Sequence, residues 1–254
     1  MAEEKKLGPF AGFVLLDSAQ WDPERFKADL KARWGIPYPE EGGHAAASEN
    51  SDSMAFDAEG MTVAVSFMPF PVPEHEAEQV AANNYLWPQA VEVTKGHRAQ
   101  VLVAVVGEKA GPIALATLYT KVVCALLGQP NAVAVYTSGT VFPPDFYQAV
   151  AGAMEQGELP ILDWVYFGLY RTPKGTSAYT YGMTAFGKDE MEILDSAAQP
   201  TQLRDMLFDF AYYVLDGDVT LRDGETIGFS EEQKLPITRS PGVAVEGDSL
   251  KIGF

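Results

Sequence analysis

Three histidines are the first candidates for acid–base or nucleophilic chemistry, because imidazole titrates near neutral pH. His44 lies in a stretch rich in glycine and alanine, and His75 lies at an expected helix start, so both should face solvent. His97 and Arg98 directly precede an apolar strand, where an imidazole and a guanidinium are suitably placed for proton transfer or anion binding. Together with Lys188, which follows a later strand, they define a candidate cleft for an enzyme or a small-ligand-binding protein. The competing interpretation is that His97 satisfies backbone groups at the strand end.

The sequence lacks the motifs that assemble a nucleophile, a metal or a phosphate site. It contains no Gly-x-Ser-x-Gly elbow, no pair of cysteines, no His-x-x-x-His and no glycine-rich phosphate loop. The run Glu74-His75-Glu76 cannot converge on one ion, because successive helical residues point about 100° apart. We therefore expect no catalytic residue, no metal and no cofactor. Cys124 lies within an apolar helix, which predicts a small buried side chain and not a reactive thiol.

The charge of the chain indicates the class of partner. The net charge is −17, from 18 basic and 35 acidic residues spread over the whole sequence. Nucleic acids and anionic lipids bind cationic surfaces, so neither is an expected partner. A basic protein is the expected partner, because opposite charge accelerates its capture. The alternative explanation is that the acidity serves solubility alone.

The expected location is the cytoplasm. The N-terminal residues Met-Ala-Glu-Glu-Lys-Lys are not followed by the apolar core of a secretion signal. No stretch reaches the roughly 18–20 apolar residues of a spanning helix, and a single cysteine excludes a disulfide framework.

The acidic residues are densest between positions 189 and 225, and tyrosines and phenylalanines lie in and near this segment. Tyrosines beside acids make good interface anchors, because they lose little conformational freedom on binding. The alternative is a solvated acidic face, with half of the aromatic residues turned into the core. The predicted docking patch for a basic protein consists of Asp189, Glu190, Glu192, Asp195, Asp216, Asp218, Asp223, Glu225, Tyr179 and Tyr181. Other aromatic residues of this region are Tyr166, Phe167, Tyr170, Phe208, Tyr212 and Tyr213.

The element that organises the expected fold is the apolar run 101–106, which predicts a central strand covered on both faces. A helix follows from Pro112, which can occupy a first helical position, and ends at Gly128 and Pro130.

The rest of the chain predicts an α/β (α+β) protein. Residues 1–110 alternate as strand, helix, strand, strand, helix, strand, the order of a ferredoxin-like βαββαβ unit. A similar order returns within 111–254, after the central helix. We therefore expect two ferredoxin-like halves, which allow a tandem pseudo-repeat or a single packed domain. The faint match of Trp21–Glu24 with Phe142–Asp145 favours a repeat, but any α/β chain must alternate its elements.

Several phrases resemble a bacterial family known as domain of unknown function 4261. They are Met61–Pro73, Asn83–Pro88, His97-Arg98-Ala99, Thr120–Leu127, Asp163–Val165 and Thr184–Ile193. The resemblance spans roughly residues 55–225 and transfers no catalytic residue, because the family has no accepted activity. Its members look like companions of toxin and type VI secretion loci. The resemblance therefore implies an immunity (antitoxin-type) or adaptor protein whose partner is a toxin or a secretion component.

Overall fold

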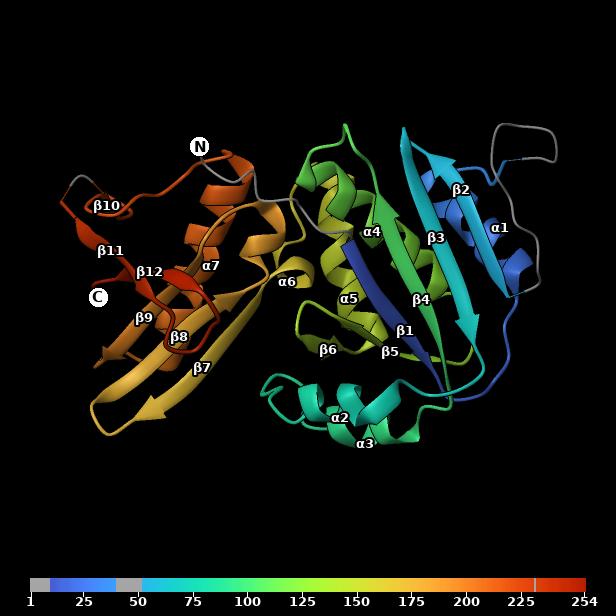
Figure 1. Ribbon diagram of the computed structural model, residues 1–254, viewed down its shortest axis with the longest axis horizontal. Coiled ribbons are helices and arrows are strands. Elements are labelled where there is room, and N and C mark those ends of the chain that lie inside the picture. Colours follow the sequence, from blue (N-terminus) through green and yellow to red (C-terminus); the bar gives the residue numbers. More distant parts are fainter. Residues whose placement is uncertain (1–9, 40–51, 231) are drawn as a thin grey trace. The chain divides into compact units, whose positions relative to one another are not determined.

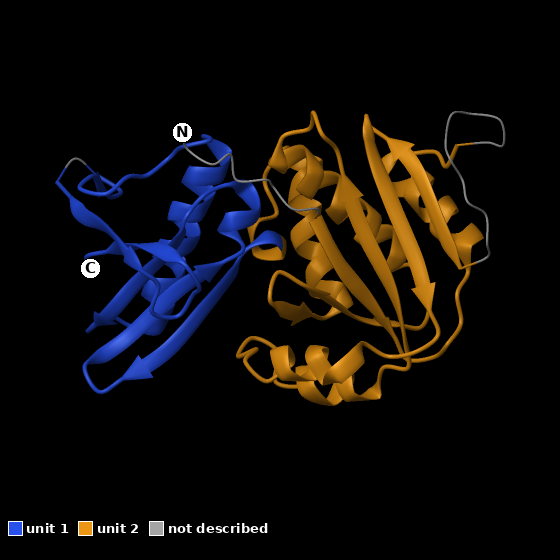
Figure 2. Ribbon diagram, in the orientation of Figure 1, with its two compact units in different colours: residues 1–7, 164–254 blue, residues 8–163 orange. Residues whose placement is uncertain are grey.

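The computed structural model describes residues 10–39, 52–230 and 232–254, so His44 lies outside the described residues. The described chain forms two compact units, an N-terminal unit that ends at Asp163 and a C-terminal unit that begins at Trp164 (Figure 2). The sequence instead predicts a boundary between residues 110 and 111. The difference arises because the helix that follows this point packs on the preceding strands and stays in the N-terminal unit.

The N-terminal unit contains a six-stranded sheet in the order β2-β3-β4-β1-β5-β6, in which all neighbours are antiparallel (Figure 1). Its strands are β1 (Phe10–Leu16), β2 (Ser53–Ala58), β3 (Met61–Met68), β4 (Ala99–Val106), β5 (Ala132–Thr137) and β6 (Thr140–Phe142).

Strand β4 lies inside this sheet, between β3 and β1, which confirms its central position. Val101, Val103 and Val105 are fully buried on one face. The other face is covered only in part, since Leu102 is half-buried and Val106 is 46% exposed. The apolar run therefore correctly predicts a strand in the middle of the sheet. The prediction that both faces of this strand are fully covered holds for one face only.

Helices cover the two faces unequally. Helices α1 (Pro23–Trp34), α4 (Pro112–Leu126) and α5 (Pro144–Ala151) contribute buried side chains to the main core, against β1, β3 and β4. The shorter elements η1 (Pro73–His75), α2 (Glu76–Ala81) and α3 (Ala90–Gly96) pack on the opposite face, over β1, β5 and β6. The unit ends with η2 (Gly152–Gln156) and α6 (Ile161–Trp164), which reaches the unit boundary.

Local signals in the sequence set the helix ends. Asp22 caps α1 by accepting a hydrogen bond from the Arg25 amide at 3.0 Å, and Gly35 ends the helix with a positive φ of 67°. Pro112 occupies the start of α4, as the sequence predicts. Cys124 of α4 is buried, which confirms the expectation for the single thiol.

The C-terminal unit contains a second six-stranded sheet, in the order β10-β11-β12-β9-β8-β7. Strands β9 and β12 are parallel, and the other neighbours are antiparallel. Helix α7 (Pro200–Asp216) packs on β7 and β8, and its buried side chains include Leu203, Leu207 and Phe210. The remaining elements are β7 (Tyr166–Thr172), β8 (Gly175–Tyr181), η3 (Met183–Phe186), β9 (Glu190–Ser196), β10 (Thr226–Ile227), β11 (Leu235–Pro241) and β12 (Asp248–Ile252).

The fold is mixed α/β, as predicted, but the ferredoxin-like halves and the tandem repeat are not confirmed. Each sheet has six strands, and the two sheets differ in topology, because a parallel strand pair occurs in the second sheet alone. Strands β5 and β6, whose residues lie in the predicted second half 111–254, complete the first sheet.

Candidate functional site

His97 is fastened to the backbone through both ring nitrogens. It is buried, its Nε2 accepts a hydrogen bond from the Val72 amide at 2.9 Å, and its Nδ1 donates to the Thr94 carbonyl. His97 therefore links the segment before η1 to the end of α3 by hydrogen bonds. This is the structural alternative given by the sequence, in which His97 satisfies backbone groups at the strand end.

The other members of the predicted ligand site have separate surroundings. Arg98 has an exposed side chain, and its backbone amide donates to the Leu16 carbonyl at 2.8 Å. Lys188 lies in the C-terminal unit and forms an ion pair with Asp218 at 2.6 Å. This ammonium holds the pKa of the exposed Asp218 carboxyl below its usual value.

Two acids of the predicted docking patch are buried, and the first is Glu190. It accepts hydrogen bonds from the Thr180 hydroxyl at 2.7 Å and from the Gly182 amide at 2.8 Å. Burial raises the pKa of Glu190, and these hydrogen bonds offset only part of the rise. The side chain joins β9 to the turn after β8, so it is unavailable to a partner and the prediction for Glu190 is wrong.

The second buried acid is Glu192, which binds the C-terminal strand region. It accepts hydrogen bonds from the Ala244 amide at 2.7 Å and from the Ser249 hydroxyl, and it pairs with Lys251 at 3.0 Å. Burial by itself raises the pKa of this carboxyl, but the hydrogen bonds outweigh burial and leave the pKa lowered. The prediction that Glu192 contacts a partner is also wrong, since the carboxylate is enclosed by donors of its own chain.

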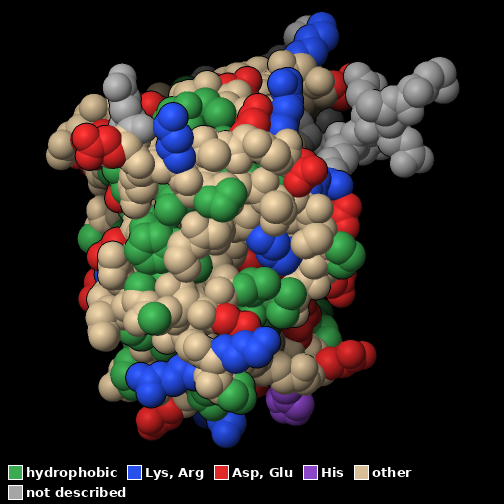
Figure 3. All heavy atoms as spheres, turned by 90° about the vertical axis from the view of Figure 1, so that its left-hand side faces the viewer, with side chains coloured by type: hydrophobic (Ala, Val, Ile, Leu, Met, Phe, Trp, Pro, Cys, Tyr) green, Lys and Arg blue, Asp and Glu red, His purple; other side chains and the backbone are tan. Residues whose placement is uncertain are grey.

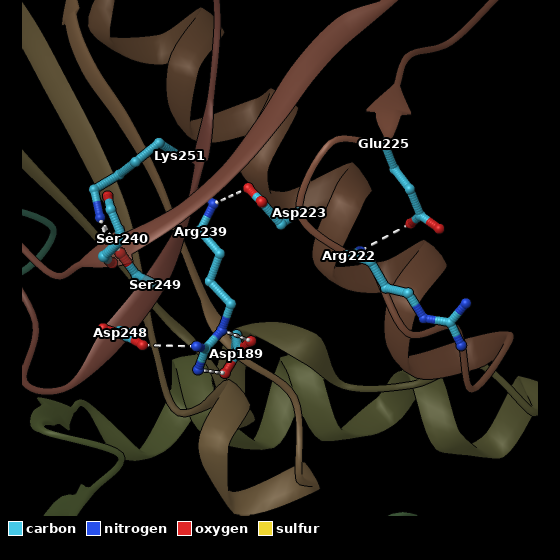
Figure 4. A network of polar contacts seen from close by, with 9 residues as sticks. All are labelled: Asp189, Arg222, Asp223, Glu225, Arg239, Ser240, Asp248, Ser249 and Lys251. Atoms are coloured by element: carbon cyan, nitrogen blue, oxygen red, sulfur yellow. Dashed lines mark hydrogen bonds and ion pairs between the residues drawn. The ribbon is translucent and has the colours of Figure 1, made fainter.

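Arg239 of β11 contacts three further acids, of which Asp189 and Asp223 belong to the predicted patch and Asp248 does not (Figure 4). Its guanidinium lies 2.9 Å from Asp189 and 2.6 Å from Asp248, and its backbone amide donates to Asp223. Glu225 accepts a hydrogen bond from the Arg222 amide at 2.8 Å. Asp189 is half-buried and the other three carboxylates are exposed, and all four also hold the loops around β10 to β12 in place.

The predicted patch also includes residues near the β7–β8 hairpin and the end of α7. Asp195 has a positive φ of 53° and accepts a hydrogen bond from the Thr172 hydroxyl. Asp216 is exposed at the end of α7, and Tyr181 is 49% exposed. The structure therefore leaves these side chains accessible, unlike Glu190 and Glu192.

The half-buried ring of Tyr179 lies across Gly168 of the neighbouring strand. The ring packs between Tyr166 and Tyr170, with ring centroids 6.2 Å from each. A methyl group at Gly168 would lie 2.1 Å from Cζ of Tyr179, so glycine is required beneath the ring. Tyr179 thus contributes mainly to the hairpin and only part of its ring to the surface.

A groove that the sequence does not reveal lies between α7 and the segment 219–229, and we call it the α7 groove. It has a volume of about 800 Å³. Tyr213 and Phe229 on its walls are 54% and 55% exposed. Phe229 stacks on the buried Phe210, with ring centroids 4.9 Å apart. The groove is also lined by Asp209 and Glu225.

Figure 3 faces the side of Figure 1 on which β10 and β11 lie, and it shows apolar side chains exposed among acidic and basic ones. Tyr213 and Asp209 belong to the aromatic and acidic sets noted in the sequence. Phe229 belongs to neither set, because it lies after the acidic segment 189–225. Its place in the groove follows from the stacking of its ring on Phe210, which only the folded structure shows.

A further buried acid lies at the end of the N-terminal unit. Asp163 of α6 is buried, and neither carboxylate oxygen has a hydrogen-bond partner among the described residues. Burial raises its pKa well above the usual value. Burial also raises the pKa of Tyr147, and the nearby Asp163 adds to that rise. The folded unit therefore favours the protonated, neutral form of this carboxyl.

Among the described residues, no cluster of three or more histidine, cysteine or acidic side chains is arranged to hold a metal ion. Within the same residues, no helix has the length and apolar character needed to span a membrane.

The family model described as "Domain of unknown function (DUF4261)" matches residues 179–253, which confirms the family predicted from the sequence. Of the phrases that carry the resemblance, Thr184–Ile193 lies in the matched segment, and those before residue 179 lie outside it. The match also includes the C-terminal strands, which the resemblance did not reach. No curated protein and no solved structure matches the chain.

Proposed function

With residues 179–253 matching a family of unknown function, we propose that this chain is a non-enzymatic protein-binding protein whose partner is a basic protein. The observation that carries the proposal is the surface of the C-terminal unit, which exposes Tyr181, Tyr213 and Phe229 among acidic side chains. Exposed aromatic rings are the side chains that most often anchor protein interfaces.

The charge of the molecule supports the same class of partner. A net charge of −17 attracts a cationic protein over a distance set by the ionic strength, and it repels nucleic acid and anionic lipid. Asp209 and Asp216 are exposed and, within the described part of the chain, have no hydrogen-bond or ion-pair partner. Both carboxylates are therefore free to pair with a cation of a partner.

The internal contacts of the other acids support the proposal indirectly. Arg239 fixes Asp189 and Asp248, and Glu192 fixes the backbone at Val243 and Ala244. A surface that is already ordered loses less conformational entropy when a partner binds. Glu190 and Glu192 thus assist binding by holding the surface in shape, in place of the direct contact that the sequence predicts.

The family resemblance makes the proposal narrower. We propose that the partner is a bacterial toxin or a secretion component, and that this chain acts in the cytoplasm as an immunity-type inhibitor. It would inhibit the toxin by covering its surface.

The direct test is co-expression with the product of the adjacent gene, followed by size-exclusion chromatography. A stable complex is expected, with an association rate that falls about tenfold or more as salt rises from low to physiological strength and beyond. The double variant Tyr181→Ala/Asp216→Asn should dissociate faster. The matched control Phe70→Ala/Glu92→Gln changes an exposed aromatic and an exposed acid of the N-terminal unit and should bind normally. Elution of this chain alone at low salt would contradict the proposal.

A further inference from the structure

We propose that the α7 groove receives an arginine side chain of the partner, presented on a segment with apolar neighbours. This inference rests on the proposed function and adds the chemistry of the contact.

The shape of the groove fits a side chain with an apolar stem and a planar charged end. Phe210, Val219 and Ile227 are buried or half-buried apolar residues of its lining, and Tyr213 and Phe229 are exposed beside them. The rings of Phe210 and Phe229 are nearly parallel, at 14°, so Phe229 is held with one face against Phe210. The methylene stem of an arginine packs on such a lining while its head remains near water.

The charge of the groove selects a cation. Asp209 lies on the α7 side, and Glu225 lies on the opposite side, at the start of the segment that leads into β10. None of the described residues that line the groove is lysine or arginine. Asp209 has no partner within the described residues, and Glu225 is held by the Arg222 amide, which leaves carboxylate acceptor capacity on both.

The aromatic residues favour arginine over lysine. A guanidinium stacks on an aromatic face and still donates hydrogen bonds in its plane, whereas an ammonium has no planar face. Tyr213 and Phe229 supply the faces, and Asp209 and Glu225 supply the acceptors. The volume of about 800 Å³ falls within the range of about 300–1,000 Å³ typical of ligand sites, so the residues next to the arginine can enter as well.

The test uses the capped pentapeptide acetyl-Gly-Leu-Arg-Leu-Gly-amide as the probe. Its matched control is the same peptide with citrulline, which keeps the shape of arginine but carries no charge. Binding to the full-length chain is measured by amide NMR shifts. The arginine peptide should shift resonances of Tyr213, Phe229 and Glu225, and the citrulline peptide should bind at least tenfold more weakly.

The variant Asp209→Asn/Glu225→Gln should lower the affinity for the arginine peptide about tenfold. The fold is retained because both side chains are exposed and the glutamine at position 225 keeps an oxygen that accepts from the Arg222 amide. The control Glu155→Gln/Glu158→Gln removes two exposed acids of the N-terminal unit and should leave the affinity unchanged. Equal binding of the two peptides, tighter binding of a lysine peptide, or shifts confined to other residues would overturn the inference.

The outcomes also separate this inference from the proposed function. If the co-expressed partner binds and the Asp209→Asn/Glu225→Gln variant retains it at full affinity, the groove assignment fails and the protein-binding function stands. If the arginine peptide binds at the groove but no partner is captured, the groove assignment stands and the proposed function fails.

Discussion

The hydroxyl of Ser249 in β12 donates a hydrogen bond to the carboxylate of Glu192 in β9, across the parallel strand pair of the second sheet. Both residues are completely buried. Fifty-seven positions separate them in the sequence. Together with Lys251, this contact fastens the C-terminal strand to the centre of its sheet.

Replacing this buried carboxylate should destabilise the C-terminal unit. Glu192→Gln removes the charge that strengthens four hydrogen bonds and places an amide donor against the donors of Val243 and Ala244. We expect a loss of about 2–3 kcal/mol in the free energy of unfolding, measured in urea. The exposed Asp216→Asn should change it by less than about 0.5 kcal/mol. Equal effects of the two variants would contradict this assignment.

The contribution of Glu192 should disappear in acid. Its pKa in the folded protein lies below the ordinary value of 4.5, so its contribution is fully present above pH 4.5 and is lost as the pH falls through the folded pKa. The difference in unfolding midpoint between the wild type and Glu192→Gln should therefore shrink from pH 7 to pH 3. A difference that stays constant over this range would count against the lowered pKa.

Asp163 should have the opposite pH dependence. Because its folded pKa is raised above 3.8, the unfolded chain ionises first and the N-terminal unit loses stability as the pH rises. Asp163→Asn cannot ionise, so its stability relative to the wild type should increase with pH, by at most about 1.4 kcal/mol per pH unit. The slope between pH 4 and pH 8, followed by thermal unfolding, is diagnostic because the cost of burying the new amide does not vary with pH. A flat difference would show that Asp163 is not buried in its neutral form.

The His97 contacts predict a local effect on one amide. His97→Ala leaves the buried Val72 amide without an acceptor, which should cost about 1–3 kcal/mol in the stability of the N-terminal unit. Hydrogen exchange at Val72 should accelerate. Arg98→Ala, which changes an exposed side chain, should leave this exchange rate unaltered. Unchanged protection at Val72 in His97→Ala would contradict the structural role.

Cys124 should be inert in the folded protein. Burial raises the pKa of its thiol to about 12 from an ordinary 9.0, and the side chain is 3% exposed. Since the thiolate is the reactive form, reaction with a disulfide reagent at pH 8 should be slower by a factor of about 10³ than in the unfolded chain. Rapid stoichiometric labelling of the native protein would contradict the buried position.

The parts of the fold that could be predicted depend on neighbouring residues. Strand β4, helix α4 and the Asp22 cap follow from apolar periodicity and from side chains within four positions of one another. The unit boundary could not be predicted, because α4 joins the first sheet through contacts with β1, about a hundred residues earlier.

The sequence predicts which kinds of residue make up the candidate site, but it does not predict which of their side chains are exposed. The acidic segment 189–225 and its tyrosines do mark the unit that carries the α7 groove. Charge, however, does not reveal that Glu190 and Glu192 face their own chain, since their donors include Thr180 before them and Ser249 after them. The signal is a glutamate in β9 that faces a hydroxyl side chain on an adjacent strand: Glu190 faces Thr180 of β8, and Glu192 faces Ser249 of β12. These pairs can be recognised only once the strand order is known.

The ring of Tyr179 leaves no space for a methyl group at Gly168 on the adjacent strand. Among natural relatives, the amino acids at these two positions should therefore change together. A chain with alanine or a larger residue at position 168 should carry a smaller side chain at position 179. The hairpin β7–β8 thus provides a pairwise rule for aligning distant relatives of this chain and for choosing compatible substitutions in it.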